Sequence, residues 1–86
     1  MKIPKIPIGT PVQINWLDIL TEPSWCSKEE FTAIEPIECI LVGIWMKPGP
    51  NCIHIASNIN ESSCDGTTIP IGCVIGIQVL KAGKRK

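Results

Sequence analysis

Prolines and glycines interrupt this chain so often that no long helix fits between them. The 86 residues include eight prolines and seven glycines, and a proline inside a helix removes a hydrogen-bond donor and breaks the helix. Isoleucine dominates the apolar residues between these breaks, and β-branched side chains fit the pleated surface of a sheet. We therefore expect one small domain built from several short strands joined by turns.

Alternating apolar and polar residues predict where these strands lie. Four strands are expected, over residues 12–18, 37–47, 52–57 and 74–81. The polar stretch 58–68 contains a glycine and is expected to be a loop. Ile-Pro-Ile-Gly occurs at 6–9 and again at 69–72, each time just ahead of a strand, and we expect the same turn at both places.

A short helix is predicted between the first two strands. Ser27-Lys28-Glu29-Glu30 matches a capping box, in which a serine side chain accepts a hydrogen bond from the first turn. The helix is expected to run for about two turns, to Ala33 or Ile34, before Pro36 ends it.

Together these elements predict a mostly β fold. It is expected to be a small, partly open barrel of the SH3-like or Sm-like kind, with four to five strands and one short helix. The barrel domain should span residues 12–81, after an extended N-terminal arm (residues 1–11) and before a basic tail (residues 82–86).

The cysteine pattern indicates free thiols in a reducing compartment. Five cysteines lie 9 to 13 residues apart, which suits neither an even disulfide framework nor the close pairs of a zinc site. The first nine residues contain no apolar run typical of a secretory signal. The longest apolar stretch, residues 39–46, is far shorter than the roughly 20 residues that cross a bilayer. We expect a cytoplasmic protein that binds no metal and enters no membrane.

No residue pattern for catalysis or for a cofactor is present. His54 is the only histidine, so it alone could activate a cysteine or serine nucleophile. Glu29 and Glu30 are adjacent on the predicted helix and therefore point apart. The chain also lacks a glycine-rich phosphate loop. We expect a binding protein without enzymatic activity.

The tryptophans point to a binding site. Trp16 lies on the apolar face of its strand and Trp45 in the most apolar strand, so both are expected in the core. Trp25 lies in an irregular segment before the helix and is free to stack on a planar ligand. Asp18 and Ser27 lie near it in the sequence and can hydrogen-bond such a ligand, or merely cap local turns. Lys47 and His54 complete the candidate ligand-binding residues.

Charge is distributed unevenly although the net charge is zero. Between Ile6 and Leu80 there are only two basic residues, Lys28 and Lys47, against all eight acidic ones. A body with about six excess negative charges repels a phosphate backbone, so nucleic-acid binding is disfavoured. The basic tail is either simply solvated or available to nucleic acid or an acidic partner.

Several short motifs together resemble small SH3-like barrel proteins encoded by tailed bacteriophages. They are Val12-x-Ile14-x-Trp16-x-Asp18, Trp25, Ser27-x-Glu29-Glu30, Val42-Gly43-Ile44 and Ile69-Pro70-x-Gly72-x-Val74. The resemblance covers residues 12–80, and it departs from the pattern at Ile19, where a small hydroxyl residue is expected.

The resemblance implies an anti-defence protein in the host cytoplasm. One such class acts as a sponge that sequesters nucleotide-derived immune signals, and this is the function we expect, in a homo-oligomer. The alternatives are a protein-interaction module that inhibits a host protein through an exposed apolar sheet face, and an Sm-like nucleic-acid-binding protein.

The cysteine spacing generates a direct test. Thiol titration of denatured protein, purified under reductant, should find five free thiols per chain, because no spacing suits a disulfide or a metal site. Stoichiometric zinc in an elemental analysis of the same sample would contradict the expectation.

Overall fold

The computed structural model describes residues 1–19 and 25–81, about half of them in strands. The strands are β1 (Pro11–Asp18), β2 (Ile37–Trp45), β3 (Cys52–Ile59), β4 (Cys64–Pro70) and β5 (Val74–Val79). A five-residue helix α1 (Lys28–Thr32) lies between β1 and β2, and a single 3-10 turn η1 (Ile71–Cys73) joins β4 to β5. The predicted mostly β fold is confirmed.

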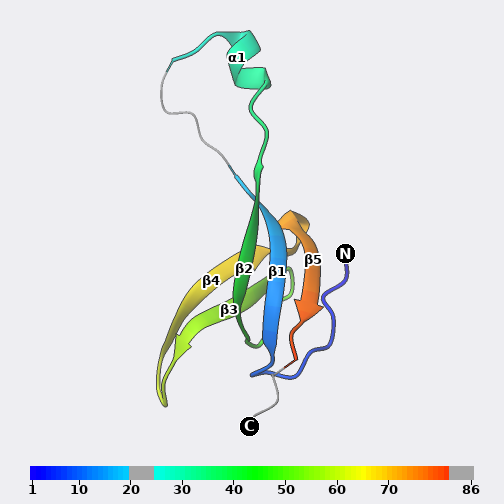
Figure 1. The fold of residues 1–86 in the computed structure, drawn as a ribbon, viewed down its shortest axis with the longest axis vertical. Helices are drawn as coiled ribbons and strands as arrows, with labels where there is room; N and C mark the ends of the chain where they lie inside the picture. The colour runs from blue at the N-terminus through cyan, green and yellow to red at the C-terminus, as the bar shows by residue number, and fades with distance from the viewer. Residues whose placement is uncertain (20–24, 82–86) are drawn as a thin grey trace.

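The five strands form one antiparallel sheet that does not close. Their order is β4-β3-β2-β1-β5, so the last strand returns to pair with the first (Figure 1). Val12 of β1 lies opposite Val79 of β5 on one side and opposite Gly43 of β2 on the other. Strand β1 is therefore the centre of one half of the sheet, and β3 is the centre of the other half, between β2 and β4.

The two halves meet where β2 crosses β3 at close range. β3 pairs with β2 only at Ile44↔Ala56 and Trp45↔Ile55. A Cβ atom on Gly43 would lie 2.6 Å from the Ala56 carbonyl oxygen, and one on Gly66 would collide with the Ile55 carbonyl. Only residues without a bulky side chain allow this approach, which turns the β3–β4 hairpin away from the long β1–β2 pair (Figure 1).

The core is built from the inner faces of all five strands. Its buried side chains are Val12, Ile14, Trp45, Ile53, Ile55, Ile69 and Val74. The expectation that Trp45 is a core residue is confirmed, and Trp16 packs against the cluster while remaining partly buried. Burying a large apolar side chain contributes roughly 1.5–3 kcal/mol each, so these residues hold the sheet in its bent form.

The N-terminal arm is attached to the same core. Ile3 and Ile6 pack against the buried cluster. The Gly9 N–H donates to the Trp45 carbonyl at 2.8 Å, and the Trp45 N–H donates to the Thr10 carbonyl at the same distance. The chain reverses at Gly9, whose φ of 97° is a left-handed conformation that favours glycine. The arm thus covers the core of its own chain.

The prediction of a loop over residues 58–68 is wrong. β3 continues to Ile59 and β4 begins at Cys64, so only residues 60–63 form a turn. The Asn60 side-chain oxygen accepts hydrogen bonds from the backbone N–H groups of Ser62 and Ser63, at 3.0 and 2.8 Å. This Asx turn closes the hairpin, and cross-strand pairing overrides the polar character of the segment.

The repeated Ile-Pro-Ile-Gly does not form the same turn twice. Its first copy makes the reversal at Gly9. Its second copy ends β4 with Ile69 and Pro70 and begins η1 with Ile71 and Gly72. Pro70 is tolerated in β4 because β4 is an edge strand.

Residues 25–36, which comprise α1 and its flanking residues up to the start of β2, project from the sheet, and we call them the projecting segment (Figure 1). The Glu30 N–H donates to the Ser27 hydroxyl oxygen at 3.0 Å, which confirms the helix cap, but α1 ends at Thr32 instead of Ala33 or Ile34 and buries none of its residues. The radius of gyration is 16.2 Å, whereas a compact domain of this length has about 12 Å. Within residues 1–19 and 25–81, no helix has the length and apolarity needed to cross a membrane.

Two isoleucines provide a matched test of the core. Ile53 is fully buried, whereas Ile75 on β5 is 47% exposed. Ile53→Ala should lower the free energy of unfolding by about 2–5 kcal/mol, and Ile75→Ala should change it by about 0.5 kcal/mol or less. Urea denaturation followed by tryptophan fluorescence measures both, and equal losses for the two variants would contradict this core.

Candidate functional site

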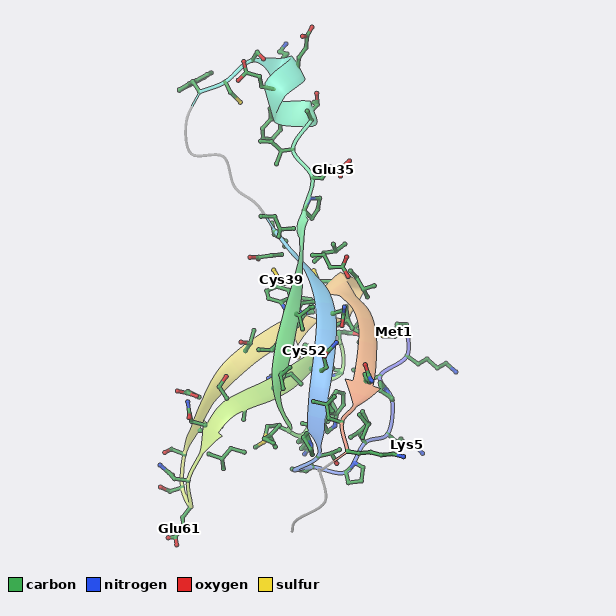
Figure 2. All side chains as sticks on the ribbon, in the orientation of Figure 1. Met1, Lys5, Glu35, Cys39, Cys52 and Glu61 are labelled. Atoms are coloured by element: carbon green, nitrogen blue, oxygen red, sulfur yellow. The ribbon has the colours of Figure 1, made fainter. Side chains whose placement is uncertain are left out.

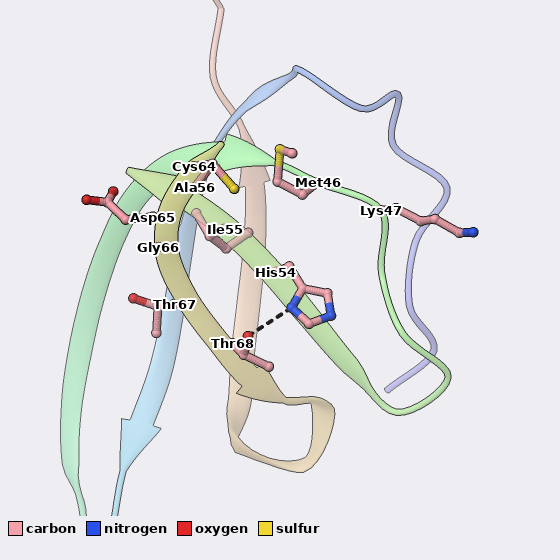
Figure 3. A pocket seen from close by; sticks show the side chains of 10 residues that line it. All are labelled: Met46, Lys47, His54, Ile55, Ala56, Cys64, Asp65, Gly66, Thr67 and Thr68. Atoms are coloured by element: carbon pink, nitrogen blue, oxygen red, sulfur yellow. Dashed lines mark hydrogen bonds between the residues drawn. The ribbon is translucent and has the colours of Figure 1, made fainter. Parts of the chain in front are cut away.

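A groove of about 390 Å³ lies on the β3–β4 hairpin (Figure 3). It is lined by Met46 and Lys47 after β2, by His54–Ala56 of β3 and by Cys64–Thr68 of β4. We call it the β3–β4 groove. Its volume falls within the range of small-molecule sites, which is roughly 300–1,000 Å³.

His54 is fixed at one end of the groove by its neighbours on the sheet. It lies opposite Thr68 in the β3–β4 register, and its Nδ1 atom is 2.8 Å from the Thr68 hydroxyl oxygen (Figure 3). Its Nε2 atom is 3.6 Å from the Cys52 sulfur, because residues two apart in a strand share one face. The ring therefore keeps one orientation, with a face available to the groove.

The Cys52–His54 contact does not place a nucleophile in the groove. The turn after β2 folds back over Cys52, and the Gly49 N–H donates to the Cys52 carbonyl at 3.0 Å. A Cβ atom on Gly49 would lie 2.8 Å from the Cys52 sulfur, so this thiol faces the turn. His54 and Thr68 line the groove, but Cys52 does not. A nucleophile has to face the place where a substrate sits.

The charged groups of the groove are few. Lys47 lies at one end and Asp65 at the other (Figure 3). The Asp65 carboxylate accepts a hydrogen bond from the Asn58 amide at 3.0 Å, which holds it beside β3. The other described acidic residues, except Glu61, lie in the segment between Asp18 and Glu38. The groove thus has a local balance of charge that the acidic excess between Ile6 and Leu80 conceals.

The five residues predicted for the site fall into two groups. Lys47 and His54 line the groove. Trp25, Ser27 and Asp18 lie in or beside the projecting segment, which points away from the β3–β4 hairpin (Figure 1). Trp25 is fully exposed, Ser27 caps α1 and Asp18 is the exposed last residue of β1. One chain does not bring the two groups together.

The part of the groove that β4 supplies lies in a stretch that the sequence does not predict to be a strand. Thr67, Thr68, Gly66 and Cys64 all lie in the stretch expected to be a loop. The signal that identifies them is the pair of β-branched threonines followed by Ile69, after an asparagine suited to a turn.

No metal ligands gather among the residues that the structure describes. Within them, no group of three or more histidine, cysteine, aspartate or glutamate side chains lies close enough to hold an ion. All five cysteines have free thiols, and those of Cys26 and Cys64 are exposed.

Comparison with models of protein families, with curated proteins and with solved structures gives no significant match to this chain.

Proposed function

We propose that this protein is a small SH3-like binding protein that captures a ligand without transforming it. The strand order β4-β3-β2-β1-β5 supports the SH3-like assignment, because the last strand returns through one 3-10 turn to pair with the first. The open sheet is consistent with a barrel that is only partly closed.

The proposed ligand is a nucleotide held in the β3–β4 groove. The observation that carries this proposal is that Lys47 and His54 both line a groove whose lining also includes the buried, apolar Ala56. Small-molecule sites typically combine apolar walls with a few polar groups that fix orientation. The imidazole ring of His54 offers a planar surface to a base, and the Lys47 ammonium offers a charge to a phosphate.

The distribution of charge supports an anionic ligand at this place. The excess of acidic residues between Asp18 and Glu38 lies on the projecting segment and the adjoining parts of β1 and β2. Exposed charges separated by more than about 8–10 Å are largely screened at physiological salt. A phosphate beside Lys47 is therefore repelled mainly by Asp65, whose carboxylate already accepts a hydrogen bond from Asn58.

Capture without turnover fits the role of an anti-defence sponge in the host cytoplasm. The resemblance to phage-encoded proteins suggests this role, and the orientation of Cys52 toward the Gly49 turn keeps the Cys52–His54 pair from acting on a ligand in the groove. A sponge needs only affinity and abundance, which an 86-residue domain can supply.

Lys47 provides the test of this function. Isothermal titration with adenine and guanine nucleotides, including cyclic dinucleotides, should identify one class that binds and is recovered unchanged. Lys47→Ala should weaken that binding about 10- to 100-fold, because a hydrogen bond to a charged group contributes about 1.5–3 kcal/mol. Lys81→Ala, which removes an equally exposed lysine outside the groove, should leave the affinity unchanged.

Two outcomes would contradict the proposal. One is the absence of binding to every nucleotide in the panel, together with no nucleotide released when the purified protein is denatured. The other is that Lys47→Ala and Lys81→Ala weaken nucleotide binding equally, which would mean that the overall charge of the protein attracts the nucleotide and no particular site holds it.

A further inference from the structure

The side of β2 that faces away from β1 lacks a strand partner along most of its length. β1 pairs with β2 from Ile37 to Ile44, whereas β3 pairs with it only at Ile44 and Trp45. Among the described strands, none pairs with residues 37–43 on that side. We call this stretch the free edge of β2.

The direction of the backbone groups along this edge follows from two hydrogen bonds. The Trp45 N–H donates to Thr10 on the β1 side, and the Met46 N–H donates to His54 on the β3 side. Backbone groups alternate in direction along a strand. The N–H and C=O groups of Glu38, Ile40 and Val42 therefore point away from β1, toward the free edge.

The free edge lacks the features that protect sheet edges from other chains. It contains no proline and no lysine, and its one charged residue is Glu38. Ile40 and Val42 are 66% and 57% exposed. The outer strand β4 differs, because it carries Asp65, Gly66 and Pro70, and charges and prolines discourage edge pairing. An exposed apolar edge of this length favours pairing with a strand of another chain.

We propose that a second copy of this chain pairs with the free edge, so that two β2 strands run antiparallel about a two-fold axis at Ile40. In this register Ile40 lies opposite the partner's Ile40, and Glu38 lies opposite the partner's Val42. The outward N–H and C=O groups of Glu38, Ile40 and Val42 then form backbone hydrogen bonds with the same three residues of the other copy. An antiparallel pair of identical strands is the arrangement that a two-fold axis produces.

Registers with the two-fold axis at a nearby residue give less favourable strand pairing. An axis at Cys39 places Val42 opposite the partner's Pro36, which has no N–H to donate. An axis at Leu41 places Glu38 opposite the partner's Ile44, which β3 already engages at Ala56. An axis at Glu38 sets two like charges directly opposite each other, which is destabilising. With the axis at Ile40, Pro36 falls opposite Ile44, so the ladder ends where β3 takes over the edge.

The exposed apolar surface is large enough for such a dimer. Six apolar side chains of β2 and the projecting segment are 40–102% exposed: Trp25, Phe31, Ile34, Ile37, Ile40 and Val42. If each loses on the order of 100 Å² of accessible surface, two copies together bury roughly 1,200 Å², the lower bound for a specific interface. In Figure 2 no other element surrounds the projecting segment, on which Glu35 is labelled. Because Pro36 falls opposite the partner's Ile44, the antiparallel arrangement directs this segment past the end of the partner's β2, toward its β3–β4 hairpin.

The test is the mass in solution of three proteins at the same micromolar concentration. Light scattering should give the natural protein twice its mass of 9.4 kDa. Ile40→Lys should weaken self-association about a hundredfold and give the monomer mass, because it places two lysines opposite each other at the axis. Ile75→Lys makes the same change at an exposed isoleucine of β5 and should remain dimeric. Far-ultraviolet circular dichroism confirms that each variant is folded.

A photoreactive residue at position 40 tests the register without relying on a charge. After irradiation and digestion, mass spectrometry should join position 40 to residues 38–42 of the partner. A natural protein that is monomeric, including one that binds a host polypeptide instead, would overturn the proposal. A dimer that survives Ile40→Lys, or that cross-links outside β2, would overturn it as well. The result does not depend on what the β3–β4 groove binds.

Discussion

The close approach of β2 to β3 determines the shape of the whole sheet. Gly43 lies beside Ala56, and Ala56 lies opposite Gly66, so three small residues stand in a line across three strands. A larger side chain at either glycine would collide with the backbone of β3. Because the strands can approach here, the sheet bends enough for one face to enclose Trp45 and the surrounding isoleucines. The same bend separates β3 from the first part of β2 and creates the free edge.

Periodicity predicts the apolar strands well and the polar ones badly. β1 and β2 alternate or are continuously apolar, so burial of one face fixes their positions and the core role of Trp45. β4 reads Cys-Asp-Gly-Thr-Thr-Ile-Pro and buries only Ile69, so its strand character comes from pairing with β3. The sequence singles out Lys47 and His54, which both line the groove, but for this reason it does not reveal their neighbours on β4. The two copies of Ile-Pro-Ile-Gly show that context outweighs local sequence here.

The projecting segment and the β3–β4 groove differ in charge, a difference that the amino-acid composition alone does not reveal. The acidic residues accumulate around the projecting segment, whereas the groove holds Lys47 and a carboxylate that Asn58 already engages. A body that repels a long polyanion can therefore still accept a small one, since screening confines repulsion to near neighbours. The projecting segment carries these acidic residues together with exposed aromatic side chains. Such a surface suits contact with another protein and disfavours nucleic acid, because the acidic residues repel phosphates.

The pairing of β1 with β5 has a consequence for how the protein folds. Val12 pairs with Val79, 67 positions later in the sequence, and among the described strands only β5 covers the edge of β1 that faces away from β2. Contacts between such distant residues slow the folding of small β proteins, because loop-closure entropy is lost before the contacts form. We expect folding to be a cooperative event that waits until β5 has been synthesised. Until then, the Ile-rich strands of the nascent chain remain open to chaperones.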